Sequence, residues 1–380
     1  MQENIRVLVI DLSKRYGGAS VRALYLAHHL RSWGSAIAGL ENSPVIKIAR
    51  ERDIPVKLVG RERFDPLIPL RLSRVIHEAQ FLLIDTQNIQ SKFWASFTTL
   101  ITGVAFVSTL NSSYRDEQGN AWKGKIYALI DWWTNFNVDR FIAVSQPIKR
   151  DLIKTGVPEG MVDLITNAVD IDSSLLIKDP MQMRREVGIP EDAFLISSVG
   201  RLVWAKGYDD FIQAFGSLVD RLPKAYAVII GEGILHSALE ERIKNSGLVN
   251  HIRLLGHYDV GKTLNMVRAS DVFVLSSRSE GVPYALLEAA ALGLPIVSTR
   301  CGGIPDIFTD NVDALLIPIG DSAALSSALI RLWEDRTFAK WIASNAKAKI
   351  ERDRSISTHI DAIRQAYAMA LDHHKAKTRR

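Results

Sequence analysis

The sequence predicts an α/β protein that consists of two doubly wound, parallel-sheet domains. Apolar, β-branched runs alternate with segments of helical period along almost the whole chain, and these runs fall into two series. Continuous apolar strands that helices separate are typical of parallel sheets covered on both faces. The length of 380 residues is enough for two such domains, each with its own core.

The two series of strands define the domain boundary. The first series comprises IRVLVI from Ile5, FLLI from Phe81, VAFVST from Val104 and RFIAVS from Arg140. The second comprises FLISSVG from Phe194, AYAVIIG from Ala225, IRLLG from Ile252, DVFVLSS from Asp271 and PIVST from Pro295. A polar, irregular stretch from Asp170 to about Pro190 separates them, so we expect domains at 1–168 and 169–356. Because such sheets bind ligands at the carboxyl ends of their strands, two domains predict a central cleft.

Composition narrows the class of protein. Hydrophobic residues make up 47% and charged residues 23%, as in an ordinary globular protein. No segment supplies the roughly 18 uncharged apolar residues of a membrane span, and the first residues lack the basic start of a signal peptide. Cys301 is the only cysteine, which excludes an internal disulfide and a thiolate metal cage. The expected location is therefore the cytoplasm.

Charge is distributed unevenly along the chain. Up to Ala168 there are 21 Lys and Arg against 16 Asp and Glu, whereas the remainder has 26 of each. The excess leaves two interpretations open, an ordinary solvated face or an anionic partner such as a phosphorylated acceptor or a membrane surface. Peripheral binding at the inner face of the cell membrane would follow from the second. Nucleic acid is not an expected partner, because no block interleaves basic and aromatic residues.

Glycine-containing loops follow two of the strands. Gly17 and Gly18 stand between the first strand and a predicted helix, where glycine lets the backbone approach an anion or simply makes a tight turn. Gly231 and Gly233 begin like a dinucleotide-binding fingerprint, but His236 occupies the third glycine position, so we interpret them as structural. No GxxxxGK[ST] motif occurs, which excludes P-loop nucleoside triphosphatases.

Two glutamates flank the start of a predicted helix in the segment SSRSEGVPYALLEAAALGLPIVST. Pro283 suits a first helical turn and Gly293 suits a helix end, which puts Glu280 before the helix and Glu288 in its second turn. A diphosphate at the helix N-terminus would have a carboxylate on either side, and each carboxylate could accept hydrogen bonds from hydroxyl groups of a sugar. The alternative is that Glu280 caps the helix and Glu288 is a surface residue.

Cations follow another strand of the same domain, in SVGRLVWAKGYDD. Gly200 and Arg201 come directly after the strand, and Lys206 follows on the same loop. An Arg fork and a Lys point charge can together clamp a diphosphate, although each could equally be a surface charge.

At these residues the chain resembles a retaining glycosyltransferase of family 4, also described as group 1, with the GT-B fold of two Rossmann-like domains. The matching segments are the Gly17-Gly18 loop, FIAVSQPIKRDLIKTGVP, the ITNAVD linker strand, SVGRLVWAKG, VIIGEG, LLGHYDV, SEGVPYALLEA with its E-x7-E spacing, and STRCGGIPDI. The resemblance implies an N-terminal acceptor domain that a C-terminal helix at about 357–380 completes. It implies a C-terminal domain that binds a UDP- or GDP-sugar.

The resemblance also implies a role for each candidate residue. Arg201 and Lys206 bind the donor diphosphate and stabilise the leaving group, and Glu280 orients the transferred sugar. Glu288 holds the ribose hydroxyls, and the Gly18 amide closes on the distal phosphate. The remaining donor-binding candidates are Gly17, Gly200, Gly281, Val282, Pro283 and Leu287. No metal or other cofactor is expected. The expected acceptor is a glycan or lipid-linked hydroxyl in cell-surface polysaccharide, lipopolysaccharide or glycolipid synthesis.

One position departs from the family pattern. Asn111 stands where the family commonly has a histidine in the acceptor and sugar region. An Asn can hydrogen-bond a sugar hydroxyl but cannot act as a base. Asn111 therefore leaves open a non-catalytic nucleotide-sugar-binding homologue. A nucleotide-sugar epimerase or phosphorylase of the same fold is the other alternative, but an epimerase would need acid and base groups in the cleft, and Asn111 argues against it.

Other motifs have structural interpretations. Asp170 and Asp172 form a DxD at the linker, which we interpret as a turn rather than a metal site. Trp132 and Trp133, and the arginine-rich segment around Arg63 and Arg74, could be membrane-facing elements. For the tryptophans we expect ordinary core packing instead, and the arginine segment is equally consistent with an ordinary surface. The HHKAKTRR tail is expected to be a frayed basic end.

Overall fold

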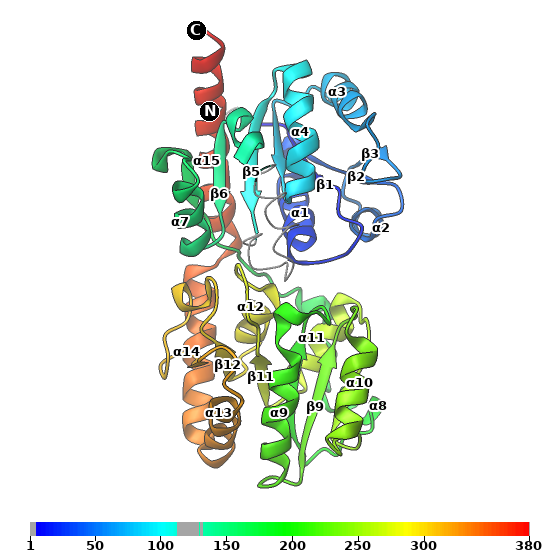
Figure 1. The fold of residues 1–380 in the computed structure, drawn as a ribbon, viewed down its shortest axis with the longest axis vertical. Helices are drawn as coiled ribbons and strands as arrows, with labels where there is room; N and C mark the ends of the chain where they lie inside the picture. Colours follow the sequence, from blue (N-terminus) through cyan, green and yellow to red (C-terminus); the bar gives the residue numbers. More distant parts are fainter. Residues whose placement is uncertain (1–4, 112–128, 130–131, 380) are drawn as a thin grey trace. The chain divides into compact units, whose positions relative to one another are not determined.

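The protein is described by a computed structural model that covers residues 5–111, 129 and 132–379. The chain forms two compact units, drawn in Figure 1. The first unit comprises Met1–Asn167 together with Ser357–Arg380, and the second comprises Ala168–Ile356. In the described part of the chain, none of the helices combines the length and the hydropathy that a bilayer crossing requires.

The first unit contains a seven-stranded parallel sheet in the order β3-β2-β1-β4-β5-β6-β7. Its strands are β1 (Val7–Asp11), β2 (Ala36–Leu40), β3 (Val56–Gly60), β4 (Leu83–Thr86), β5 (Ala105–Leu110), β6 (Arg140–Ala143) and β7 (Val162–Leu164). Its helices are α1 (Gly18–His29), α2 (Pro44–Glu51), α3 (Ile68–Ala79), α4 (Ile89–Thr102), α7 (Gln146–Lys154) and most of α15 (Ile356–Thr378), with 3₁₀ turns η1 (Arg31–Trp33), η2 (Asn135–Asn137) and η3 (Glu159–Met161). The strand order reverses between β1 and β4, which is where such sheets bind ligands.

The second unit contains a six-stranded parallel sheet in the order β10-β9-β8-β11-β12-β13. Its strands are β8 (Phe194–Val199), β9 (Ala225–Ile230), β10 (Ile252–Leu254), β11 (Val272–Leu275), β12 (Ile296–Thr299) and β13 (Leu315–Ile317). Its helices are α8 (Met181–Glu186), α9 (Tyr208–Val219), α10 (His236–Asn245), α11 (Val260–Arg268), α12 (Tyr284–Ala291), α13 (Ser322–Glu334) and α14 (Arg336–Asp353), with 3₁₀ turns η4 (Ser173–Leu175), η5 (Trp204–Lys206) and η6 (Ile304–Asp306). Here the order reverses between β8 and β11.

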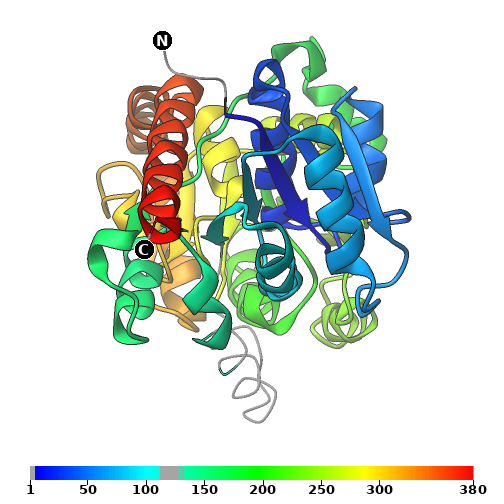
Figure 2. The ribbon, with the colours of Figure 1, turned by 90° about the horizontal axis from the view of Figure 1, so that it is seen from above.

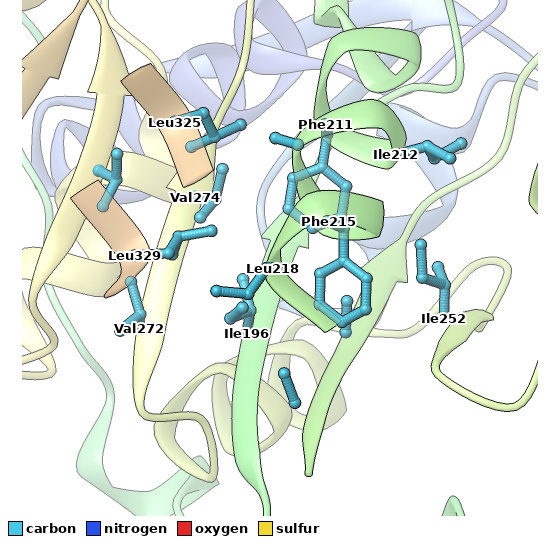
Figure 3. Close-up of a cluster of buried hydrophobic side chains, with 14 of the residues drawn as sticks. Ile196, Phe211, Ile212, Phe215, Leu218, Ile252, Val272, Val274, Leu325 and Leu329 are labelled. Atoms are coloured by element: carbon cyan, nitrogen blue, oxygen red, sulfur yellow. The ribbon is translucent and has the colours of Figure 1, made fainter. Parts of the chain in front are cut away.

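One face of the second sheet forms a continuous apolar core with α9 and α13 (Figure 3). Phe211, Phe215 and Leu218 of α9 are fully buried against the strands. Leu325 and Leu329 of α13 complete the layer on the β11 side. Their spacing of three or four residues along each helix is the pattern that buries one helical face. The core therefore fixes the strand ends, and with them the loops that leave the sheet.

Helix α15 is anchored to the first unit by a buried polar network. The hydroxyl of Tyr367 donates to Asp85 Oδ2 at 2.7 Å, and Thr109 Oγ1 donates to Asp85 Oδ1 at 2.9 Å. All three side chains are buried. Desolvation raises the pKa of Asp85 to about 6, although these hydrogen bonds and the nearby Arg22 favour its charged form. The helix runs beside α7 in both views of the ribbon (Figures 1 and 2).

The α/β class with two parallel sheets is confirmed, and several local predictions are wrong. Strands β2, β3, β7 and β13 were not predicted. The expected linker strand over ITNAVD is absent, because β7 ends at Leu164 and the chain after Ile165, whose N–H donates to Ala143 O, does not continue the strand. The tail is not frayed, since α15 continues to Thr378 and His374 is held by Asp139 at 2.9 Å.

Candidate functional site

Two loops meet at the carboxyl edge of the second sheet, where the strand order reverses. One loop follows β8 and carries Arg201 and Lys206, and the other follows β11 and carries Glu280. Gly207 allows them to touch: it has φ +62°, and a Cβ there would lie 2.1 Å from the Ser276 carbonyl oxygen. Only glycine satisfies both conditions. The backbone therefore holds the two loops together independently of any ligand.

The contact brings a cation and a carboxylate together. Lys206 Nζ forms an ion pair with Glu280 Oε1, and Ser277 Oγ donates to the same oxygen at 2.6 Å. Only 16% of the Lys206 side chain and 10% of the Glu280 side chain are exposed. A partly buried pair of this kind holds both groups in fixed positions at the edge. The side chains that the sequence assigned to the diphosphate and to the sugar are therefore neighbours.

Arg278 fastens these loops, and the sequence did not single it out. Its guanidinium lies 5.1 Å from the centre of the Trp204 ring and pairs with Asp210 at 2.8 Å. Its backbone amide donates to Ala205 O at 2.8 Å. The turn that carries Lys206 is thus bound to the β11 loop by both main-chain and side-chain contacts. No motif predicts this, because the partners are far apart in the sequence.

A third loop, in the segment STRCGG, supports the backbone of Glu280. Gly302 has φ +54°, and a Cβ there would lie 1.6 Å from the Glu280 carbonyl oxygen. The amide of Gly303 donates to Gly281 O at 2.9 Å. The absence of a side chain at Gly302 therefore lets the loop after β12 pack against the backbone that leads into α12. The hydrogen bond from Gly303 holds it there.

Helix α12 begins at this edge without a side-chain cap. Pro283 is the cap residue, and it makes no side-chain cap hydrogen bond. A helix N-terminus of this kind suits a bound anion, because its amides and dipole favour negative charge. Val282 and Leu287 are buried, and Leu287 is fully inaccessible. The structure therefore gives the Leu287 side chain a packing role.

Glu288 presents its carboxylate from the second turn of α12. The residue is half-buried, and among the described residues no hydrogen bond or ion pair engages its carboxylate. Burial raises the pKa of Glu288 to about 7. A carboxylate that has lost part of its hydration without gaining a partner is costly to keep charged. It is therefore suited to accept hydrogen bonds from a ligand.

The remaining candidates of this unit differ in exposure. Arg201 is exposed, whereas Gly200 lies against Lys206 and the Tyr208 hydroxyl. A Cβ at Gly231 would lie 2.0 Å from the Gly200 carbonyl oxygen, and one at Gly233 would lie 2.2 Å from a carbonyl of the same loop. These two glycines therefore have the structural role that the sequence predicted, since they let the β9 loop pack against the β8 loop.

The single cysteine lies near this edge but is not a nucleophile. Cys301 is buried, and burial raises the pKa of its thiol to about 12. The thiolate that nucleophilic chemistry needs is therefore not formed near neutral pH.

In the first unit, Gly17 and Gly18 lie at the start of α1, after β1. Gly17 has an extended backbone with φ −170°, and a Cβ there would meet no atom within 4 Å. Neither conformation nor packing requires glycine at 17. The open space above this residue is consistent with the close approach of a ligand.

Asn111 follows β5 at the same edge of the first sheet. Its Nδ2 donates to the Gln87 carbonyl oxygen at 3.0 Å, and its buried Oδ1 has no hydrogen-bond partner. Gln87 follows β4, the strand beside β5. Asn111 therefore keeps an acceptor available at the edge where the sequence placed the acceptor region.

Across the described ranges, no group of three or more His, Cys, Asp or Glu side chains is placed to hold a metal ion. Asp172, part of the DxD, instead accepts the amide of Ser174 at 2.9 Å and caps η4.

Two family models match consecutive parts of the chain. The model for family 4 glycosyltransferases matches residues 16–173, and the model for group 1 glycosyl transferases matches residues 181–349. Together they match well over half of the sequence. The chain belongs to the group 1, family 4 glycosyltransferases. The second match contains every candidate residue of the β8, β11 and α12 loops.

Relatives and solved structures agree with this assignment. An uncharacterized glycosyltransferase of Methanocaldococcus jannaschii is 24% identical over 278 residues, which is 72% of this chain and 71% of the relative. The UDP-Gal:alpha-D-GlcNAc-diphosphoundecaprenol alpha-1,3-galactosyltransferase of Escherichia coli is 27% identical over 273 residues, 70% of this chain and 67% of the relative. A structure of HepE from Anabaena in complex with UDP-glucose matches with a TM-score of 0.84 at 20% identity, over 96% of this chain and 99% of HepE. This glycosyltransferase therefore has the GT-B fold.

Proposed function

We propose that the protein transfers a sugar from a UDP-sugar to a hydroxyl group of a glycan or lipid-linked acceptor, with retention of anomeric configuration and without a metal ion. A GDP-sugar is the alternative donor. The observation that carries the proposal is the half-buried, unpartnered carboxylate of Glu288 beside the uncapped start of α12. One edge of the sheet thus offers carboxylates that can accept hydrogen bonds from sugar hydroxyls. It also offers the amides of a helix N-terminus and two cations, which can bind a diphosphate.

The donor occupies this edge of the second unit. The Glu288 carboxylate accepts hydrogen bonds from the two ribose hydroxyls. These hydrogen bonds replace those to the water that burial has removed. The diphosphate lies at the start of α12, where Arg201 and Lys206 balance its charge. Glu280 is already held beside Lys206, and its carboxylate accepts hydrogen bonds from hydroxyl groups of the transferred sugar. HepE, a structural neighbour, is described in complex with UDP-glucose, which favours UDP over GDP.

Transfer takes place on one face of the sugar. The acceptor oxygen bonds to the anomeric carbon as the bond to the diphosphate oxygen breaks, and the acceptor proton passes to a donor phosphate oxygen. The cations Arg201 and Lys206 stabilise the charge that develops on the leaving group. No protein base is needed for this step, so Asn111 is compatible with it and serves to hydrogen-bond a sugar hydroxyl.

The acceptor side is proposed on the first unit, with a membrane nearby. The loop and helix after β3 expose Phe64, Leu67 and Leu70 at 68, 49 and 57%. Arg63 stacks on the Phe64 ring at 4.7 Å. Exposed apolar side chains beside arginines are typical of surfaces that contact anionic lipids. The name of the Escherichia coli relative describes a lipid-diphosphate acceptor, which supports a role in surface polysaccharide or glycolipid synthesis at the inner face of the cell membrane.

Thermal unfolding with UDP, GDP and ADP tests the donor site. A ligand at about 100 times its Kd adds roughly 2.7 kcal/mol of stability. We expect UDP to raise Tm in the wild type and to have little effect on Glu288→Ala. Glu241→Gln, an exposed carboxylate on α10, is the matched control and should respond like the wild type.

Turnover separates the alternatives. Release of UDP that depends on an added acceptor supports transfer, whereas conversion of the donor sugar without acceptor would support an epimerase. Nucleotide binding without either reaction would indicate that the protein is a non-catalytic nucleotide-sugar-binding homologue. The absence of a Tm shift with every nucleotide would contradict the donor site itself.

A further inference from the structure

A groove of about 690 Å³ lies at the amino edge of the first sheet. It is bounded by η2, by the starts of β6 and β7 and by the last turns of α15. Its floor and walls are apolar, with Phe136, Phe141, Val157, Pro158 and Met161 among the lining residues. This volume is in the range of small-molecule sites. The groove lies at the opposite end of the strands from Asn111, roughly 15–20 Å away at 3.3 Å per residue.

The end of α15 shapes the groove and supplies its charge. His374 Nδ1 lies 2.9 Å from Asp139 Oδ2, and His374 Nε2 lies 2.7 Å from Gly103 O. Both partners are acceptors, so both ring nitrogens of His374 face oxygen atoms of the first unit. These bonds hold the helix so that His373 and Lys377 line one side of the groove. The residues set aside in the sequence as a basic tail thus form the wall of a cavity.

The polar lining is cationic or neutral. The described lining residues include no Asp or Glu. Among the described residues, no ion pair or hydrogen bond engages the Lys377 ammonium. Lys92 Nζ donates to Asn135 Oδ1, which fixes the amide orientation, and Asn135 Nδ2 is left without an acceptor. The two unsatisfied groups that line the groove, the Lys377 ammonium and Asn135 Nδ2, are donors, so the complementary ligand carries an anionic acceptor group.

Exposed aromatic rings continue from the groove over the surface. Trp132 and Phe136, which line the groove, are 48 and 64% exposed and stack edge-to-face at 5.1 Å. Trp133 is 44% exposed and contacts Phe97 of α4 at 5.5 Å. Tryptophan is enriched where a protein meets the headgroup region of a bilayer, because one end of its ring is polar. The rim of the groove therefore has the composition of a membrane interface.

We propose that this groove binds the hydrocarbon chain of an anionic lipid, whose phosphate group lies against Lys377 and Asn135. The apolar walls contact the hydrocarbon chain of the lipid, and the cationic side contacts its phosphate group. Trp132, Trp133 and Phe136 rest in the headgroup layer beside it. The site anchors the first unit and is separate from the edge where transfer is proposed, so it does not depend on the donor chemistry.

Calorimetric titration of the full-length protein with decyl phosphate, below its micelle concentration, tests the site. Inorganic phosphate supplies the head alone, and decyl maltoside supplies the chain alone. We expect decyl phosphate to bind at least about tenfold more tightly than either. Flotation with phosphatidylcholine vesicles, with and without phosphatidylglycerol, then tests whether the lipid is bound in a bilayer, with binding that weakens as salt increases.

Two variants with matched controls locate the site. Ala376→Trp fills the groove from exposed helix α15 and should weaken decyl phosphate binding about tenfold or more, whereas Gln365→Trp, exposed on the same helix outside the groove, should not. Lys377→Glu should weaken binding and reduce its salt dependence, whereas Lys375→Glu should change it little.

Four results would overturn the proposal. Equal binding of inorganic phosphate would mean an anion site only, and equal binding of decyl maltoside would mean that the head is not recognised. Unchanged binding by Ala376→Trp would place the lipid elsewhere. Concentration-dependent dimerisation that Ala376→Trp abolishes, without lipid binding, would assign the groove to a second copy of the chain. Unaltered thermal unfolding of the variants shows that each outcome reports on the groove and not on the fold.

Discussion

Replacing Glu288 with glutamine should stabilise the ligand-free protein at alkaline pH and weaken its response to UDP. Burial raises the pKa of Glu288 from 4.5 to about 7. The folded state therefore binds more protons than the unfolded state between these values, and stability falls as pH rises through this window. One pKa unit corresponds to about 1.4 kcal/mol, so the carboxylate costs up to about 3 kcal/mol above about pH 8.

The glutamine variant keeps the shape of the side chain and removes the charge. Its stability relative to wild type should be nearly unchanged at about pH 4 and should increase by up to about 3 kcal/mol at about pH 8. The gain in stability on adding UDP should differ in the opposite sense. Loss of hydrogen bonds to a charged acceptor costs about 1.5–3 kcal/mol, or roughly 10–150-fold in Kd. Wild type should gain stability with UDP, and the variant should gain much less.

Urea unfolding at the two pH values, with and without UDP, measures both effects. Glu241→Gln controls for the removal of a carboxylate from the surface of the same unit. If Glu288→Gln is no more stable than wild type at about pH 8, the carboxylate does not carry a desolvation cost. If the variant is stabilised by UDP as strongly as wild type, Glu288 does not bind the nucleotide, and the reasoning about this helix fails.

Further substitutions test separate parts of the account. Gly207→Ala should destabilise the second unit by at least about 1–3 kcal/mol in urea unfolding, because its Cβ would clash with a carbonyl oxygen. Gly17→Ala should leave unfolding unchanged yet weaken UDP-sugar binding in calorimetry, since only a ligand would meet its Cβ. Lys206→Met should lower kcat by about 100-fold or more with a smaller change in KM, as expected for a group that acts on the leaving group. Tyr367→Phe should cost about 1–3 kcal/mol, and more above about pH 6 than below it, because ionised Asp85 loses a buried donor.

Most strands of the two sheets could be predicted from the sequence, whereas β2, β3, β7 and β13 could not. Strands β1, β5, β8 and β9 are runs of almost entirely buried residues, and their pattern is unambiguous. Strand β3 is an edge strand with mostly half-exposed residues, and β13 has only three residues. Neither carries enough of a periodic signal. Tertiary pairing, rather than local propensity, makes them strands.

The candidate site could be predicted to the level of loops, because the motifs directly follow strands and the carboxyl ends of parallel strands meet at one edge. The contacts inside it could not. Arg278 reaches Asp210 and Trp204 across the fold, and the Gly302 contact with the Glu280 backbone depends on the packing of two loops. The raised pKa of Glu288 depends on burial without a partner, which only the coordinates define. The same is true of the α15 groove, since a helix expected at about 357–380 does not show which residues its last turns pack against.

The most direct test of the central claim is proton NMR of the purified protein with a panel of UDP- and GDP-sugars and a simple glycan acceptor. We predict release of UDP that requires acceptor, and a product whose anomeric coupling constant matches that of the donor. Lys206→Met should form product about 100-fold or more slowly, and Glu241→Gln should be active. A product of inverted configuration would contradict retention, and the absence of nucleotide release from every donor would contradict the assignment of catalysis to this edge of the second sheet.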